Sequence, residues 1–227
     1  NMKNSMPELV RPEFSVKDAS LLLEEHYGLC CTLKEFPGER DRNFLAQEKK
    51  GETYVLKISN SCETLEFLQV QHAALERSSK LLEPGRIPIV FPDKNGESLL
   101  RVSSADGSQH WMRLVRYVDG LPMAEYRPHT GEFLRELGRM CGTVTKALHE
   151  IPAPPPSHTL LWEMHNVQET LHEYLPWIKD EKLLGWVKKS LDLYSRTIEA
   201  LESKLRRGWI HNDFNDYNVL AVPKISG

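Results

Sequence analysis

The chain has 227 residues, of which 40% are hydrophobic and 27% are charged, and its formal net charge is -3 at pH 7. These values are typical of a globular protein with one large domain or two small ones. The slight negative charge excludes a general attraction to nucleic acid or to an anionic membrane. No apolar run approaches the roughly 20 residues of a membrane-spanning helix. Neither nucleic acid nor a membrane is therefore expected as a partner.

The first half of the chain is predicted to be rich in strands. A helix is expected over 14–27, where Ser15 is a plausible N-cap and apolar residues recur at helical spacing. A second helix is expected over 62–79. Runs of β-branched and aromatic residues predict strands at 31–36, 43–47, 53–58, 87–91, 99–102 and 111–117.

The second half is predicted to be helical. The expected elements are helices at 133–149, 167–174 and 180–205, followed by a short strand at 219–222. The composition changes near Asp119, so two lobes are expected in an α+β fold. Residues 1–118 would form a lobe with a leading helix, a sheet and one further helix, and residues 119–227 would form a partial helical lobe.

The cysteines indicate a reducing environment. Cys30 and Cys31 are adjacent, Cys62 and Cys141 are far apart, and no C-x-x-C pair suggests zinc. No basic segment followed by an apolar one opens the chain, as a secretory signal would. We therefore expect reduced thiols and a cytoplasmic location. An incidental disulfide or a reactive thiol is the alternative.

The most informative segment is His211–Asn218, which reads H-N-D-F-N-D-Y-N. Phosphoryl transfer needs a carboxylate near the acceptor hydroxyl and oxygen ligands for magnesium. Kinases take both from a loop of the form H-R-D-x-x-x-x-N, and Asp213 and Asn218 have that spacing. A predicted helix precedes the loop and a predicted strand follows it. The alternative is a polar turn rich in Asn and Asp.

This segment resembles the aminoglycoside phosphotransferase and choline kinase group, whose usual form is H-G-D-x-x-x-x-N. Its D-x-N-D-x-N form is most similar to the hydroxylysine kinase branch. The resemblance implies a protein-kinase-like two-lobe fold, with an antiparallel-sheet N-lobe and a mainly helical C-lobe. It also implies Mg²⁺ as cofactor and ATP or GTP as co-substrate. Asp213 would be the catalytic base, Asn218 a magnesium ligand and His211 a support for the loop, while Asn212 in place of glycine is expected to shift the backbone.

The second signal is Lys57, in the strand T-Y-V-L-K-I. A lysine in an apolar strand is costly to bury without a partner. Kinases place such a lysine on the third strand, where it holds the nucleotide's phosphates. The alternative is a lysine on the solvent face of an edge strand. By the resemblance, Gln71 stands where a helical partner of this lysine is expected. Glutamates on the same helix are alternative partners: Glu63, Glu66 and Glu76.

Further nucleotide contacts follow from the resemblance. The turn at 37–42 lacks G-x-G-x-x-G, but Asp41 and Asn43 resemble the D-x-N-F stretch of the hydroxylysine kinase branch. The backbone of Arg116, Tyr117 and Val118 would meet the purine. An ordinary hairpin and an ordinary strand end explain these residues equally well.

The acceptor would lie near a few polar and aromatic side chains. Trp162 and His165 fall in the region that covers the acceptor in this group, and Asp216 of the loop is a further candidate. A tryptophan with polar neighbours suits an amino-acid or amino-alcohol substrate. The alternative is that Trp162 belongs to the core.

In this group a D-F-G or D-x-D stretch follows the loop, and its Asp holds magnesium. The chain ends at about the position where that strand would begin. We therefore expect a longer natural polypeptide, with further domains possible, and expect this fragment alone to be inactive. The expected function is transfer of the γ-phosphoryl group to a hydroxyl of an amine-bearing molecule such as hydroxylysine. Homoserine, choline or a sugar is an alternative acceptor, and a regulatory pseudokinase that binds nucleotide or amino acid is an alternative of another class.

Overall fold

The computed structural model describes residues 11–38, 40–49, 51–152 and 166–222. They belong to two compact units, one made of Asn1–Ile151 with His211–Gly227 and the other of Pro152–Ile210. The catalytic loop predicted from the sequence therefore lies in the same unit as the predicted nucleotide-binding strands. The expected lobe boundary between residues 118 and 119 is a different division of the chain and stays a prediction.

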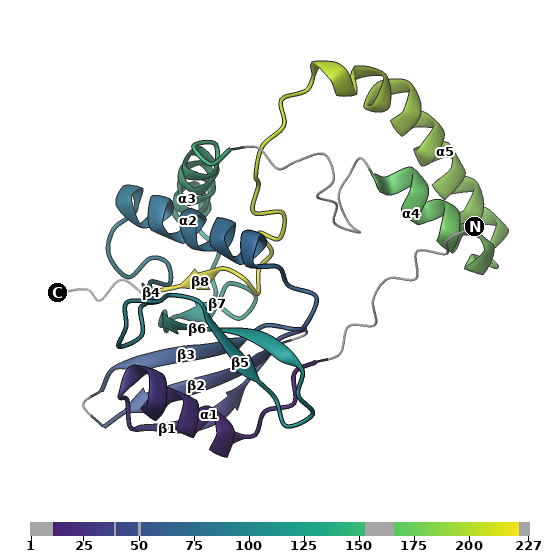
Figure 1. Ribbon diagram of the computed structural model, residues 1–227. Helices are drawn as coiled ribbons and strands as arrows, with labels where there is room; N and C mark the ends of the chain where they lie inside the picture. The colour runs from purple at the N-terminus through teal and green to yellow at the C-terminus, as the bar shows by residue number, and fades with distance from the viewer. Residues whose placement is uncertain (1–10, 39, 50, 153–165, 223–227) are drawn as a thin grey trace. The chain divides into compact units, whose positions relative to one another are not determined.

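A six-stranded antiparallel sheet forms the centre of the first unit (Figure 1). Five strands lie in the order β1-β2-β3-β6-β4, and β5 also pairs with β6. The strands are β1 (Cys31–Phe36), β2 (Arg42–Glu48), β3 (Thr53–Ile58), β4 (Val90–Phe91), β5 (Leu100–Ser103) and β6 (Gln109–Arg116). All six were predicted from the sequence, β1 and β3 with the same bounds and the other four with slightly different ones.

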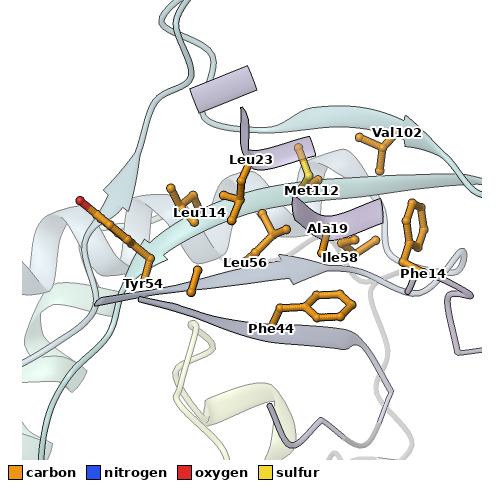
Figure 2. Close-up of a cluster of buried hydrophobic side chains, with 11 residues drawn as sticks. Phe14, Ala19, Leu23, Phe44, Tyr54, Leu56, Ile58, Val102, Met112 and Leu114 are labelled. Atoms are coloured by element: carbon orange, nitrogen blue, oxygen red, sulfur yellow. The ribbon is translucent and has the colours of Figure 1, made fainter. Parts of the chain in front are cut away.

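Helix α1 (Val16–Leu22) covers one face of the sheet and continues as a π-helical turn, Leu23–Tyr27. Ser15 caps it, because its hydroxyl accepts from the Asp18 N–H while the Asp18 carboxylate accepts from the Ser15 N–H. Figure 2 shows the resulting core between helix and sheet. Its side chains come from α1, its π-helical turn, the preceding segment and strands β2, β3, β5 and β6: Phe14, Ala19, Leu23, Phe44, Ala46, Tyr54, Leu56, Ile58, Val102, Met112 and Leu114.

The other face of the sheet carries helix α2 (Leu65–Leu81). Successive side chains of a strand point to opposite faces of the sheet. Leu56 and Ile58 point into the core under α1, so the Lys57 side chain points to the other face, toward α2. Arg113 points to the same face as Lys57, because its neighbours Met112 and Leu114 point into the core. Its guanidinium donates a hydrogen bond to Gln71 of α2. Helix α3 (Gly131–Leu148) packs beside α2 (Figure 1).

A second, two-stranded sheet was not expected in full. Strand β7 (Leu121–Pro122) pairs with β8 (Leu220–Ala221), the strand that follows the catalytic loop. The sequence predicts β8 but not β7, because two residues that include a proline show no periodicity. The pairing needs close approach at Gly120, where an added Cβ would lie 2.9 Å from the Leu220 Cβ.

The second unit is helical. Helix α4 (Val167–Tyr174) is followed by the 3₁₀ turn Leu175–Trp177, and helix α5 (Glu181–Thr197) by the 3₁₀ turn Glu199–Lys204. The helix expected over 180–205 is therefore an α-helix only as far as Thr197. No helix among the described residues is long and apolar enough to cross a membrane.

Leu56 provides a test of the core. Its side chain has no solvent exposure, so Leu56→Ala should lower the free energy of unfolding by about 2–5 kcal/mol through lost burial and the cavity left behind. Urea denaturation of the full-length protein measures the change. Leu21→Ala is the matched control, because Leu21 on α1 is 55% exposed and should cost about 0.5 kcal/mol or less. Equal losses from the two variants would contradict this core.

Candidate active site

The catalytic loop is organised around the Asp213 carboxylate. Its Oδ1 accepts from Asn215 Nδ2 and its Oδ2 accepts from Asn218 Nδ2, both at 2.6 Å. Asn218 Nδ2 also donates to the Asp213 carbonyl at 2.9 Å. The structure thus brings Asp213 and Asn218, the two residues singled out by the motif, into direct contact.

Asn215 was missed by the sequence reasoning, although both polar atoms of its side chain form hydrogen bonds within the loop. Its amide nitrogen donates to Asp213, while its Oδ1 accepts from the backbone N–H of Tyr217 at 2.9 Å and of Asn218 at 3.1 Å. The second pair of contacts is a side-chain turn of the kind that asparagine forms readily. The signal in the sequence was Asn215 itself, two residues after Asp213.

The contact between Asp213 and Asn218 decides which atom could bind a metal. The Asn218 amide nitrogen is engaged, so its amide oxygen is the atom left for a hard cation, which prefers oxygen ligands. No group of three or more His, Cys, Asp or Glu side chains in the described part of the chain could hold a metal by itself. Magnesium ions commonly take most of their ligands from phosphates and water. An amide oxygen beside an exposed carboxylate fits such an ion.

The residue before Asp213 has an uncommon backbone conformation. Asn212 has a φ of 61°, in the left-handed region that glycine and asparagine tolerate best. Asparagine can therefore occupy the usual place of glycine without opposing this loop conformation. The neighbouring His211 ring meets the Phe214 ring edge to face, with centroids 5.0 Å apart. The predicted role of His211 as a support for the loop stays a prediction.

The loop is tied to the segment that follows β6. The backbone N–H of Ala124 donates to the Asp216 carbonyl at 3.0 Å, and that of Met123 donates to the Val219 carbonyl at 2.8 Å. These bonds continue the β7–β8 pairing toward the loop. The Asp216 side chain is exposed. Its proposed contact with the acceptor stays a prediction, and Trp162 and His165 lie outside the described residues.

The sheet face opposite α1 carries two neighbouring rows of side chains. The pairing of β2, β3 and β6 aligns one polar row and one apolar row on this face: Asn43, Lys57 and Arg113, then Leu45, Val55 and Val115. An apolar row suits the flat face of a base, and a cationic row suits phosphates. The role of Lys57 in binding a nucleotide's phosphates stays a prediction.

Lys57 is part of a central strand, because β3 pairs with β2 on one side and β6 on the other. The alternative of an edge-strand lysine is wrong. Its ammonium has no hydrogen bond or ion pair among the described residues. Burial lowers the pKa of Lys57, as does the Arg113 charge, while Asp41 raises it. Lys57 is half-buried, and a partly desolvated cation without an acidic partner is unfavourable until an anion binds.

Gln71 contacts a different cation from the one expected. Its Oε1 accepts from Arg113 Nη2 at 2.6 Å. The alternative glutamates offer Lys57 no ion pair within the described structure. Glu66 is exposed, Glu76 pairs with Lys80 at 2.7 Å, and the pKa of Glu63 is raised by burial and by nearby Asp41. The sequence reasoning missed Arg113, whose only signal is a charged residue inside the strand W-M-R-L-V.

Asp41 and Asn43 shape the turn between β1 and β2. Asp41 Oδ1 accepts from both the backbone N–H and the side-chain amide of Asn60, each at 3.1 Å. Asn43 Nδ2 donates to the Pro37 carbonyl at 3.0 Å. A Cβ at Gly38 would clash with the Asn43 amide, so glycine is required there. Whether either side chain also contacts the nucleotide stays a prediction.

The predicted hinge has one backbone N–H without a partner among the described residues. The N–H of Arg116 donates to the Ile89 carbonyl at 2.8 Å and that of Tyr117 to the Thr53 carbonyl at 3.0 Å. The Val118 N–H has no partner in the described structure, so it is the donor that a purine could use. The Tyr117 ring meets the Phe36 ring edge to face, with centroids 6.0 Å apart.

Comparisons with known proteins agree with this geometry. The model of the phosphotransferase enzyme family (APH) matches residues 32–227. Hydroxylysine kinase from Danio rerio is 24% identical over 235 residues, which cover 96% of this chain and 64% of that protein. The chain thus spans just under two thirds of this curated relative.

Two solved structures share the fold. The microcompartment-associated aminopropanol kinase has a TM-score of 0.66 at 18% identity, covering 92% of this chain and 66% of its own. The amicoumacin kinase hAmiN, determined in complex with AMP-PNP, Ca²⁺ and Ami, has a TM-score of 0.59 at 12% identity, covering 85% and 55%. These matches confirm the expected α+β, protein-kinase-like fold.

The conformation of Asn212 leads to a prediction. Asn212→Val should destabilise the protein by about 1–2 kcal/mol, because a β-branched residue is strained at positive φ. Asn212→Gly should change the unfolding free energy by about 0.5 kcal/mol or less. Chemical denaturation of both variants measures the difference. A valine variant as stable as the glycine variant would show that Asn212 does not hold this conformation.

His72 leads to a prediction about pH. Burial and the Arg113 charge lower the pKa of His72 from 6.5 to about 4. Between about pH 6.5 and about pH 4, His72 is therefore protonated in the unfolded chain but not in the folded protein. Protonation therefore favours the unfolded state, and His72 should reduce stability as the pH falls from about 6.5 to about 4. In His72→Gln, the loss of melting temperature between about pH 7 and about pH 5 should be smaller. His172→Gln, at an exposed position in α4, is the control and should leave the loss unchanged.

Proposed function

The chain belongs to the phosphotransferase enzyme family, and we propose on that premise that the full-length protein is a small-molecule kinase. It would transfer the γ-phosphoryl group of ATP or GTP to a hydroxyl of an amine-bearing molecule. The observation that carries this proposal is the direct contact between Asp213 and Asn218 in a loop of kinase spacing. The catalytic loop and the Lys57 strand also belong to one compact unit.

Each residue has a distinct task in this reaction. The Asp213 carboxylate would orient the acceptor hydroxyl and take its proton as the acceptor oxygen bonds to the γ-phosphorus. The bond from that phosphorus to the bridging oxygen breaks, leaving the nucleoside diphosphate and a phosphomonoester. Asn218 would hold magnesium, which neutralises charge on the phosphates. Lys57 would bind the phosphates, and the Val118 N–H would bind the purine.

Hydroxylysine is the acceptor to test first. One curated relative is a hydroxylysine kinase and one structural neighbour is an aminopropanol kinase, so both names point to hydroxyl acceptors that carry an amine. Homoserine, choline and a sugar are the alternatives. We also propose a cytoplasmic location, Mg²⁺ as the metal and possible further domains in the same polypeptide.

The proposal is tested by coupled phosphorylation with the full-length protein. Mg²⁺ and either ATP or GTP are supplied with a panel of amino-acid, amino-alcohol and sugar acceptors, and formation of the nucleoside diphosphate is measured. Asp213→Ala should lower turnover by about 10²–10⁴-fold, because it removes the general base. Asp192→Asn, an exposed carboxylate on α5, is the control and should retain wild-type turnover.

The outcomes separate the alternatives. Turnover on one acceptor that is lost in Asp213→Ala would establish the kinase and identify its substrate. Turnover that survives in Asp213→Ala would contradict the role given to this loop. Nucleotide binding without turnover on any acceptor would instead indicate a binding module.

A further inference from the structure

Arg113 is a buried cation that the roles above do not use. Only 6% of the residue is exposed, although it lies in the middle of β6. Its Nη2 donates to Gln71 Oε1, while its Nε and Nη1 are buried with no hydrogen-bond partner among the described residues. Unpaired guanidinium groups are rare in protein interiors because each lost hydrogen bond is costly.

The position of Arg113 beside Lys57 adds to this cost. The two residues are directly opposite each other in the β3–β6 pairing and point to the same face of the sheet. The buried Arg113 and the half-buried Lys57 carry like charges that repel each other, and a pair of apolar residues would be more stable. The pairing is therefore hard to explain by stability alone.

The nearest acids do not cancel this charge by ion pairing. Asp41 and Glu63 are close enough to favour the charged form of Arg113, but neither forms a salt bridge with it or with Lys57 in the described structure. One Asp41 oxygen is already occupied by Asn60. Glu63 lies where burial raises its pKa and so disfavours its charged form.

Gln71 holds the Arg113 guanidinium in place without neutralising its charge. A glutamate at this helical position would pair with the guanidinium and cancel its charge. The glutamine amide oxygen instead accepts one hydrogen bond at 2.6 Å and carries no net charge. The hydrogen bond between α2 and the sheet therefore uses Arg113, and no residue of α2 forms a hydrogen bond or an ion pair with Lys57 in the described structure.

We propose that Arg113 is a positioning residue for phosphate binding, a fixed buried charge that Gln71 holds behind Lys57. Its nitrogen atoms are buried, so it acts through Lys57 rather than by touching the nucleotide. Its repulsion directs the Lys57 ammonium away from the sheet interior, and its positive field adds to the attraction for phosphates. This inference rests on the proposed kinase function.

Binding measurements on the full-length protein test the proposal. Calorimetry would give the dissociation constants of ATP with Mg²⁺ and of adenosine, which has no phosphates. Arg113→Met should weaken ATP binding by about 10-fold or more, the scale of one lost charge interaction, and change adenosine binding by less than about 2-fold. Arg101→Met, at an exposed arginine on β5, is the control and should match wild type.

A second variant tests the proposal even if Arg113→Met does not fold. Gln71→Glu places a carboxylate on Arg113 and should raise the melting temperature without nucleotide, because it neutralises the buried charge. It should also weaken ATP binding relative to adenosine. Wild-type ATP affinity in this variant would overturn the proposal.

Two further results would count against the inference. Equal losses of ATP and adenosine affinity in Arg113→Met would assign Arg113 a purely structural role, while leaving the kinase function intact. Absence of ATP binding and turnover in the wild-type protein would overturn the proposed function, and this inference with it.

Discussion

The antiparallel pairing of β3 with β6 is the interaction on which the rest of the structure depends. It places Leu56 opposite Leu114 and Lys57 opposite Arg113 in one register. Because side chains alternate between faces, the same pairing builds the apolar core under α1 and the cationic row on the other face. A slip of one residue would exchange the two faces, so stability of the core and placement of the site are set together.

The catalytic loop depends on this sheet through a short connection. The segment leaving β6 passes Gly120 and pairs as β7 with β8, which directly follows the loop. Gly120 permits this pairing, because a residue with a Cβ at this position would come too close to Leu220 of β8. Two backbone bonds from Met123 and Ala124 then hold the loop itself. The strand that would meet the purine and the loop that carries Asp213 are therefore joined by backbone contacts within one unit.

The face of the sheet opposite α1 carries an unusual arrangement of charge. Lys57 has no acidic partner from α2, and Gln71 of that helix binds Arg113 instead. Phosphates are the ligands that such a pair of cations favours. The cost of leaving the buried Arg113 and the half-buried Lys57 without acidic partners would be offset by a bound anion, which would tie affinity for such a ligand to the instability of the empty site.

The sequence by itself determined the features that depend on local pattern. Runs of β-branched and aromatic residues marked β1 to β3, Ser15 marked the start of α1, and the spacing of Asp213 and Asn218 marked the loop. Only the tertiary structure decided that Gln71 contacts Arg113 and that β7 pairs with β8, since these partners lie far apart in the chain. The same holds for the unpaired state of Lys57. Periodicity shows which way a side chain faces within its own strand, but the residue it meets is decided by strand order and by packing of a helix over the sheet.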